Sequence, residues 1–250
     1  MSEPTHLFEA DLNVDATRYP RFERVYLVLA SAFVVVLVLT NIIGIKLFAA
    51  PHDPASFALT TGIITYPLTF VITDLVSEIY GKKRADFMVL IGFAMSLLML
   101  VIVQIAIRVP AHPYWVPGEG GFYDSVEGYQ TAFESVFSLG PVLVIGSMSA
   151  YLCAQLTDNW LFHFWKRRTG GKHLWLRNNG STVFSQLVDT LVVNSILFYI
   201  GFGWPLMQGL QIMGTIYVYK VLIALVDTPL IYLGVFAIKR YLGMDQKDPA

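Results

Sequence analysis

Carboxylate and amide side chains lie inside two long apolar segments of this 250-residue chain. Asp74 and Glu78 are four residues apart, so they lie on one face of a helix. Gln186 and Asp189, three residues apart, share a face in the same way. An ionisable group inside a bilayer costs roughly 2.5 to 3.5 kcal/mol and needs a partner or a ligand. Glu78 is close to basic residues at the end of its segment, whereas Asp74 and Asp189 are deeper and indicate a binding site.

Two other apolar segments carry a lysine together with a second polar residue. Lys220 and Asp227 are seven residues apart, on one helical face and about 10 Å from each other along the axis. Asn41 lies in the first apolar segment, with Lys46 near the outer end of that segment. Both lysines can extend towards lipid headgroups, and a buried lysine–aspartate pair can be structural rather than ligand-binding. The sequence leaves these alternatives open.

Prolines interrupt two of these segments. A proline inside a helix removes one backbone hydrogen bond and kinks the helix. Pro67 follows Tyr66, an aromatic residue that can stack on a planar ligand. Pro229 follows Asp227 and Thr228. Polar groups beside a kink on two separate helices favour a ligand cavity over simple packing.

The composition is that of a membrane protein. Hydrophobic residues make up 55% of the chain and charged residues 14%, against about a quarter charged in soluble domains. The mean hydropathy is +0.58, and the net charge of -1 indicates neither nucleic acid nor an acidic partner. The single cysteine, Cys153, excludes a disulfide framework and a cysteine-based metal cluster.

Sequence signatures of enzymes are absent from the chain. It contains no G-x-x-x-x-G-K-[ST] loop, no H-E-x-x-H and no G-x-S-x-G. Its five histidines all fall in loops or interfacial segments. We therefore predict a protein that is not an enzyme and that has neither a cofactor nor a resident metal.

Six segments are long enough to cross a bilayer as helices, since about 20 apolar residues span its hydrocarbon core. Each must be helical, because lipid cannot hydrogen-bond to free backbone groups. We therefore predict an all-α, polytopic bundle of six transmembrane helices. The predicted spans are 25–48, 57–79, 86–109, 136–157, 179–200 and 212–238.

Lysine and arginine residues gather on alternate sides of these spans, and such residues favour the cytoplasmic side. The three that lie within spans or at their outer ends are Lys46, Arg108 and Lys220. We predict that both termini are inside, with a cytoplasmic segment at 1–24, the transmembrane domain at 25–238 and a cytoplasmic tail at 239–250. Three spans that start inside and three that start outside also allow an inverted 3+3 repeat.

Two segments outside the spans have distinct compositions. The outer loop 110–135 is rich in proline, glycine, aromatic and acidic residues, and 129–137 fits a short interfacial helix. The inner segment 158–168 mixes tryptophan and phenylalanine with basic residues, so we expect it to continue the fourth helix into the headgroups. A short echo, QLTD at 155–158 and QLVD at 186–189, is weak evidence for a repeat.

Motifs on four predicted helices resemble one family. YPLTFVITD at 66–74, continuing to EIYGKKR at 78–84, resembles the signature of the queuosine precursor transporters, a group within the vitamin uptake transporters. WLRNNGST at 175–182, continuing to Gln186 and Asp189, resembles the second hallmark of that family. The other positions that fit the family pattern are Asn41, Lys46, Lys220, Thr228, Pro229 and Tyr232.

The resemblance implies a bacterial inner-membrane importer of a 7-deazaguanine, such as 7-cyano-7-deazaguanine, for queuosine salvage in tRNA. A carboxylate can accept two adjacent N–H groups from a guanine-like edge, and an amide can read its carbonyl. We expect Asp189 or Glu78 to read that edge beside Gln186, with Lys220 as a carbonyl donor or a structural counter-charge. We expect Asn41, Asp74 and Asp227 to complete the binding site. The expected supporting or gating residues are Lys46, Tyr66, Pro67, Arg177, Asn178, Thr228 and Pro229.

Other functions remain open at this stage. The solute can be another planar vitamin or nucleobase, or the chain can be a non-transporting membrane scaffold. A capture subunit of an ATP-driven importer would often dock through small residues spaced by four. Ala30 and Ala32 do not have that spacing, so we expect no ATPase partner. A bundle of this size allows a homodimer, and the energy coupling is open between protons, sodium and none.

Overall fold

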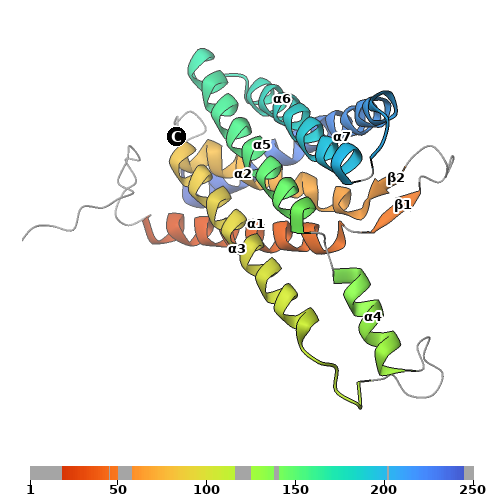
Figure 1. The fold of residues 1–250 in the computed structure, drawn as a ribbon. Coiled ribbons are helices and arrows are strands. Elements are labelled where there is room, and N and C mark those ends of the chain that lie inside the picture. The colour runs from red at the N-terminus through yellow and green to blue at the C-terminus, as the bar shows by residue number, and fades with distance from the viewer. Residues whose placement is uncertain are drawn as a thin grey trace, which may run out of the picture.

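The computed structural model describes residues 19–44, 46–49, 58–115, 125–137, 141–201 and 203–244, which are nearly all helical (Figure 1). A short two-stranded hairpin interrupts the helices, so the predicted all-α class is confirmed apart from this element. The elements are α1 (Tyr19–Ile43), β1 (Leu47–Ala49), β2 (Ala58–Thr60), the 3-10 helix η1 (Thr61–Ile64), α2 (Tyr66–Tyr80), α3 (Lys82–Arg108), α4 (Val126–Phe137), α5 (Pro141–Arg168), α6 (Leu174–Ser195), the π-helix η2 (Ile196–Gly201) and α7 (Leu206–Leu242).

Five helical segments in the described ranges are long and apolar enough to cross a membrane: α1, η1 with α2, α3, α6 with η2, and α7. The chain is therefore a multi-pass membrane protein. The predicted span 136–157 falls largely on α5, which is 28 residues long but outside this set. Polar residues in the second half of α5, including Gln155 and Asp158, reduce its apolar character. The count of six spans and their orientation stay predictions.

The first two predicted spans extend beyond the helices. α1 ends at Ile43, and β1 pairs with β2 in an antiparallel register that places Leu47 opposite Thr60. The predicted spans 25–48 and 57–79 are therefore wrong at the ends that face each other. Their error has a simple cause: the two strands are as apolar as the helices beside them, so hydropathy does not separate them.

Pro67 does not kink α2. It lies in the first turn of that helix, where a backbone N–H would have no helical acceptor in any case. The predicted kink at Pro67 is therefore wrong, whereas Pro229 does lie inside α7. α2 continues without interruption to Gly81, which turns the chain into α3 with φ 79° and ψ 172°.

Replacing Gly81 with alanine is expected to lower the free energy of unfolding by about 1 to 3 kcal/mol, because this backbone region is essentially restricted to glycine. A Cβ at Gly81 would meet no atom within 4 Å, so the cost is backbone strain alone. The measurement is thermal unfolding in detergent. Gly214→Ala is the matched control, since a Cβ there also meets nothing and its φ is helical. Equal unfolding temperatures for the two variants would contradict the assignment of strain.

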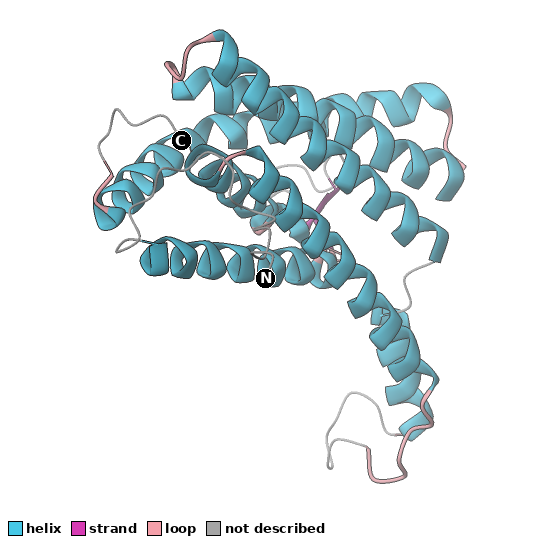
Figure 2. Cartoon of the chain, turned by 90° about the vertical axis from the view of Figure 1, so that its left-hand side faces the viewer, coloured by secondary structure: helices cyan, strands magenta, loops and turns pink. Residues whose placement is uncertain are grey.

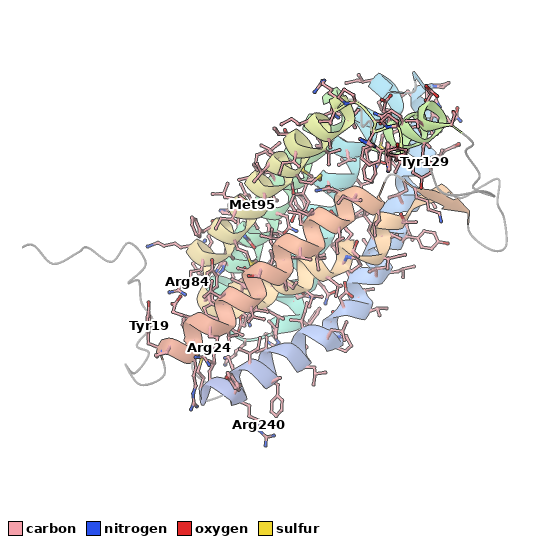
Figure 3. The ribbon with its side chains drawn as sticks, turned by 90° about the horizontal axis from the view of Figure 1, so that it is seen from below. Tyr19, Arg24, Arg84, Met95, Tyr129 and Arg240 are labelled. Atoms are coloured by element: carbon pink, nitrogen blue, oxygen red, sulfur yellow. The ribbon has the colours of Figure 1, made fainter. Side chains whose placement is uncertain are left out.

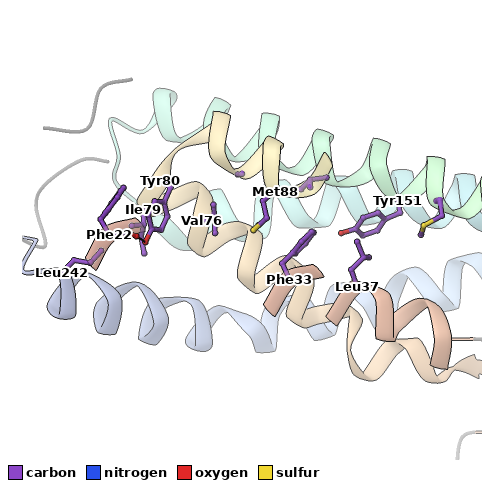
Figure 4. Close-up of a cluster of buried hydrophobic side chains, with 12 residues drawn as sticks. Phe22, Phe33, Leu37, Val76, Ile79, Tyr80, Met88, Tyr151 and Leu242 are labelled. Atoms are coloured by element: carbon purple, nitrogen blue, oxygen red, sulfur yellow. Dashed lines mark hydrogen bonds between the residues drawn. The ribbon is translucent and has the colours of Figure 1, made fainter. Parts of the chain in front are cut away.

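The helices pack around α2, which contacts α1, α3, α5 and α7. Apolar side chains from α1, α2, α3 and α5 form the main core, including Phe33, Val76, Met88 and Tyr151 (Figure 4). α1 and α3 approach closely because Gly92 carries no side chain: a Cβ there would lie 2.5 Å from the Phe33 ring. The most extensive contact joins α5 to α6, and α6 packs in turn on α7.

Two predicted segments are confirmed as helices. The expected helix at 129–137 is α4, which with the end of α3 projects away from the rest of the bundle (Figures 1 and 2). Gln130 Nε2 donates to the carbonyl of Ile107 at 3.0 Å and ties α4 to α3. The segment 158–168 continues α5 to Arg168 without a break.

Candidate functional site

A cavity lies between α2, α6 and α7 and collects several of the expected site residues. Its volume is about 20 Å³, which holds a water molecule but not a purine-sized base. A base can therefore occupy it only after the helices move apart. The residues of the cavity that matter for binding are Tyr66, Phe70, Thr182, Gln186, Lys220 and Asp227; Pro67 also lines it.

An ion pair lies at the edge of the cavity. Lys220 Nζ is 2.5 Å from Asp189 Oδ2, and the same ammonium group lies 4.8 Å from the centre of the Tyr66 ring. Lys220 is therefore paired with Asp189 in this structure, and the choice between its two expected roles stays a prediction. Asp227 is half-buried and forms no ion pair with any residue that the structure describes. Its carboxylate is thus the acidic group of the cavity that is available to a ligand.

Two buried polar atoms of the cavity lack a hydrogen-bond partner within the described ranges: Gln186 Oε1 and the Tyr66 hydroxyl. The Tyr66 hydroxyl lies near Gln186 and Asp189, but outside hydrogen-bond geometry. Leaving a buried polar atom unpaired costs about 1 to 3 kcal/mol. A ligand that supplied the missing partners would recover that cost.

Replacing Gln186 with leucine is expected to change stability and binding in opposite directions. Leucine has a similar size and removes a buried amide oxygen that has no partner in the described ranges. The unfolding temperature should therefore stay the same or rise. It also removes a hydrogen-bond partner of the ligand, so solute affinity should fall about tenfold. Thermal unfolding and equilibrium binding on the same purified samples check both results. A fall in stability together with unchanged affinity would assign Gln186 to the fold alone.

A second polar centre, the Glu78 cluster, consists of Glu78, Arg177 and Lys166. Arg177 Nη2 is 3.0 Å from one Glu78 oxygen, and Lys166 Nζ is 3.5 Å from the other. The Arg177 guanidinium also stacks on the Phe162 ring at 5.4 Å, and only 1% of Arg177 is exposed. Glu78 is eight residues along α2 from Phe70, about 12 Å, so it does not line the cavity.

Between these two centres lie buried polar residues of α5 that sequence reasoning did not include in the site. Asp158 Oδ1 accepts a hydrogen bond from Ser185 Oγ at 2.8 Å. Asn159 contacts Ser77 of α2 and donates to Asp86 of α3. The signal was present in the QLTD and QLVD echo, which places Asp158 and Asp189 at equivalent positions of two helices that do pack together.

The remaining expected residues lie away from the cavity. Thr228 is hydrogen-bonded to Asn178 at 3.5 Å and to Asn179 at 2.9 Å, which joins α6 to α7 one residue before Pro229. Asn41 donates to Ser96 at 3.2 Å and to the Met148 sulfur at 3.7 Å. Lys46 is exposed, and Asp74 is fully buried beside Asp158.

His163 and Lys166 lie beyond the predicted span 136–157, and His163 is close to Lys166 of the Glu78 cluster. Burial lowers the pKa of His163 to about 4, and the charges of Lys166 and Lys82 act in the same direction. Burial also lowers the pKa of Lys166, while the Glu78 carboxylate opposes that shift. His163 is therefore neutral at pH 7 and adds no charge to the Glu78 cluster.

Membrane-length helices around a partly polar cavity, with paired charges at membrane depth, are the features of a solute transporter. Residues 60–234 match the family model described as "Putative vitamin uptake transporter". The chain therefore belongs to the vitamin uptake transporter family, and the resemblance indicated by the motif blocks is confirmed. The matched range includes every residue of the cavity, whereas Asn41 and Lys46 precede it.

Two relatives align with most of the chain. It is 30% identical over 191 residues to a protein of Bacillus subtilis (strain 168) named "Probable queuosine precursor transporter", which covers 76% of this chain and 75% of the relative. A protein of the same name from Haemophilus influenzae (strain ATCC 51907 / DSM 11121 / KW20 / Rd) is 25% identical over 181 residues, 71% of this chain and 68% of the relative. No solved structure matches the chain.

Proposed function

We propose that this transporter imports queuosine precursors, 7-deazaguanine bases such as 7-cyano-7-deazaguanine, across the bacterial inner membrane. The cavity between α2, α6 and α7 carries the proposal, because it combines aromatic surface with a carboxylate and an amide oxygen that have no partner in the described part of the chain. The names of the two relatives support the same substrate class.

The chemistry of the cavity suits a guanine-like base. Tyr66 and Phe70 offer aromatic surface for the ring face, and stacking contributes about 1 to 3 kcal/mol per base. The adjacent N–H groups of the guanine-like edge are donors that the Asp227 carboxylate can accept as a pair. Gln186 Oε1 can accept a further N–H group of the base, while Gln186 Nε2 and Lys220 can donate to the ring carbonyl. Asp189 then acts through Lys220, whose ammonium group it holds in place.

The distribution of basic side chains supports cytoplasmic termini. Figure 3 shows Arg24, Arg84 and Arg240 at one end of the bundle and Tyr129 at the opposite end. Lysine and arginine favour the cytoplasmic side. We infer that α5 is the sixth span, because its polar residues contact α2 and α6 and so need not face lipid. The Glu78 cluster is then on the cytoplasmic side of the cavity.

Uptake of radiolabelled 7-cyano-7-deazaguanine into proteoliposomes that contain only this protein tests the proposal. We expect saturable uptake that the unlabelled base competes away and that an equal excess of guanine or of an unrelated planar vitamin competes poorly. Empty liposomes are the control. If guanine or the vitamin competed more strongly than the unlabelled base, that solute would replace 7-cyano-7-deazaguanine as the proposed substrate. No uptake by folded protein would contradict a transporter that acts alone on this base.

A further inference from the structure

Two aspartates from different helices meet inside the bundle. Asp74 of α2 and Asp158 of α5 are both 0% exposed, and their carboxyl groups are close enough to interact. Asp158 is held in place by Ser185 of α6, whose hydroxyl donates to Oδ1 at 2.8 Å. Ser77, one turn further along α2, donates to Asn159 Oδ1 of α5 at 3.2 Å, so the two helices are in contact beside the aspartates. Neither oxygen of Asp74 accepts a hydrogen bond from the described part of the chain. Asp158 Oδ2 is unpartnered in the same way.

No nearby cation is bound to either aspartate in the described ranges. Arg177 of α6 is near enough to act on Asp74, but its ion pair is with Glu78, as is that of Lys166 of α5. The other charged groups on the elements around α2 have partners of their own or act elsewhere. They are Glu23 of α1, bound by Arg84, Asp86 of α3, bound by Lys82 and Asn159, and Lys239 of α7, which acts on Lys166.

Two carboxylates in contact at a buried site cannot both stay ionised without a cation between them. One proton shared by the pair relieves the repulsion and forms a hydrogen bond between the two groups. That bond would give Asp158 Oδ2 and one of the two Asp74 oxygens the partner that each lacks. We propose that Asp74 and Asp158 form a proton-binding site, and that solute import is coupled to the binding and release of this proton.

The pair is connected to the cavity through two helices. Asp74 is one turn along α2 from Phe70, which lines the cavity. Thr182 of α6 lies beside Asp158 and also lines the cavity. Loss of the proton would make α2 and α5 repel each other at this point. Because α2 forms one wall of the cavity, the protonation state can bias whether the cavity is closed or open.

Infrared difference spectroscopy tests proton binding on the purified full chain without any solute. We expect the carbonyl stretch of a protonated carboxyl group to disappear as the pH rises, and to be missing from Asp74→Asn and Asp158→Asn. Glu127→Gln, at an exposed position of α4, is the control and should keep the band. Asp74→Asn loses no hydrogen bond in the described structure, so it should fold even if Asp158→Asn does not. A band unchanged in Asp74→Asn would overturn the proton site.

Transport coupling rests on the proposed function and has its own measurement. With the membrane potential clamped at zero, an inward gradient of one pH unit should raise the equilibrium accumulation of a neutral solute about tenfold if one proton accompanies it. Asp74→Asn should lose this accumulation and keep exchange of labelled for unlabelled solute at equal pH. Coupling would be overturned if accumulation by the wild type did not depend on the pH gradient, or if accumulation by Asp74→Asn still depended on it. Absence of any deazaguanine uptake would instead refute the proposed substrate, and the infrared result would still decide the proton site.

Discussion

Replacing Arg177 with methionine is expected to lower the free energy of unfolding by about 3 to 5 kcal/mol. Arg177 is almost fully buried, and its guanidinium group binds Glu78 of α2 while it stacks on Phe162 of α5. The variant leaves the Glu78 carboxylate with Lys166 alone, at 3.5 Å. A buried charge that loses its closest partner is not rehydrated, so most of the cost is uncompensated desolvation. Denaturant unfolding in mixed micelles, followed by circular dichroism, measures this loss.

A double-mutant cycle separates the ion pair from the loss of packing. Glu78→Gln alone should also destabilise, because it leaves Arg177 buried without a counter-charge. The double variant with Arg177→Met should be more stable than the sum of the two single effects predicts, by about 1 to 3 kcal/mol. Lys166→Met is the matched control. It removes the longer of the two contacts with Glu78 and leaves the Arg177–Glu78 ion pair intact. A cost for Arg177→Met no larger than that for Lys166→Met would contradict the central role of this pair.

The length of the apolar runs predicts most of the helices. It fails where a helix ends and no polar residue marks the end. The long apolar runs of α3 and α7 have no alternative to a helix in lipid, so their existence follows from hydropathy. The hairpin at 47–60 is different. Its strands are short, apolar and next to a span on each side, and only their pairing with each other distinguishes them from helix. The paired residues are nine to thirteen positions apart, and hydropathy along a single sequence does not reveal such pairing.

Five of the expected residues line the cavity, but the sequence did not predict which side chains contact one another. Burial cost alone selects Asp74, Asp189 and Lys220 as residues that need a reason to be inside a membrane. Which cation meets which carboxylate depends on how α2, α6 and α7 are rotated about their axes, and residue spacing does not fix that rotation. Asp189 or Glu78 was therefore expected to read the base edge beside Gln186, whereas the structure pairs Asp189 with Lys220 and Glu78 with Arg177. Asp158 was missed because a tryptophan-rich and basic segment follows it and made it resemble an interfacial residue.

Replacing Asp227 with asparagine is expected to weaken solute binding about tenfold to a hundredfold and to leave stability nearly unchanged. Asp227 lines the cavity and has no ion-pair partner in the described ranges. The asparagine therefore removes the negative charge without leaving a cation unpaired. An asparagine keeps the shape of the side chain, but it cannot accept two N–H donors from a base edge as a carboxylate does. Equilibrium binding of the labelled base to protein in micelles measures the effect.

Asp189→Asn distinguishes a ligand-reading carboxylate from one that holds a lysine. It leaves Lys220 without the carboxylate that lies 2.5 Å away, so its first effect should be a lower unfolding temperature. Any loss of affinity should follow from movement of Lys220, and Lys220→Met in the same background should restore stability without restoring binding. If Asp189→Asn instead lost affinity at full stability while Asp227→Asn bound normally, Asp189 would be the group that reads the base edge. Asp189 would then serve both partners, because Lys220 contacts only Oδ2 and an ionised carboxylate has about four acceptor sites on its two oxygens.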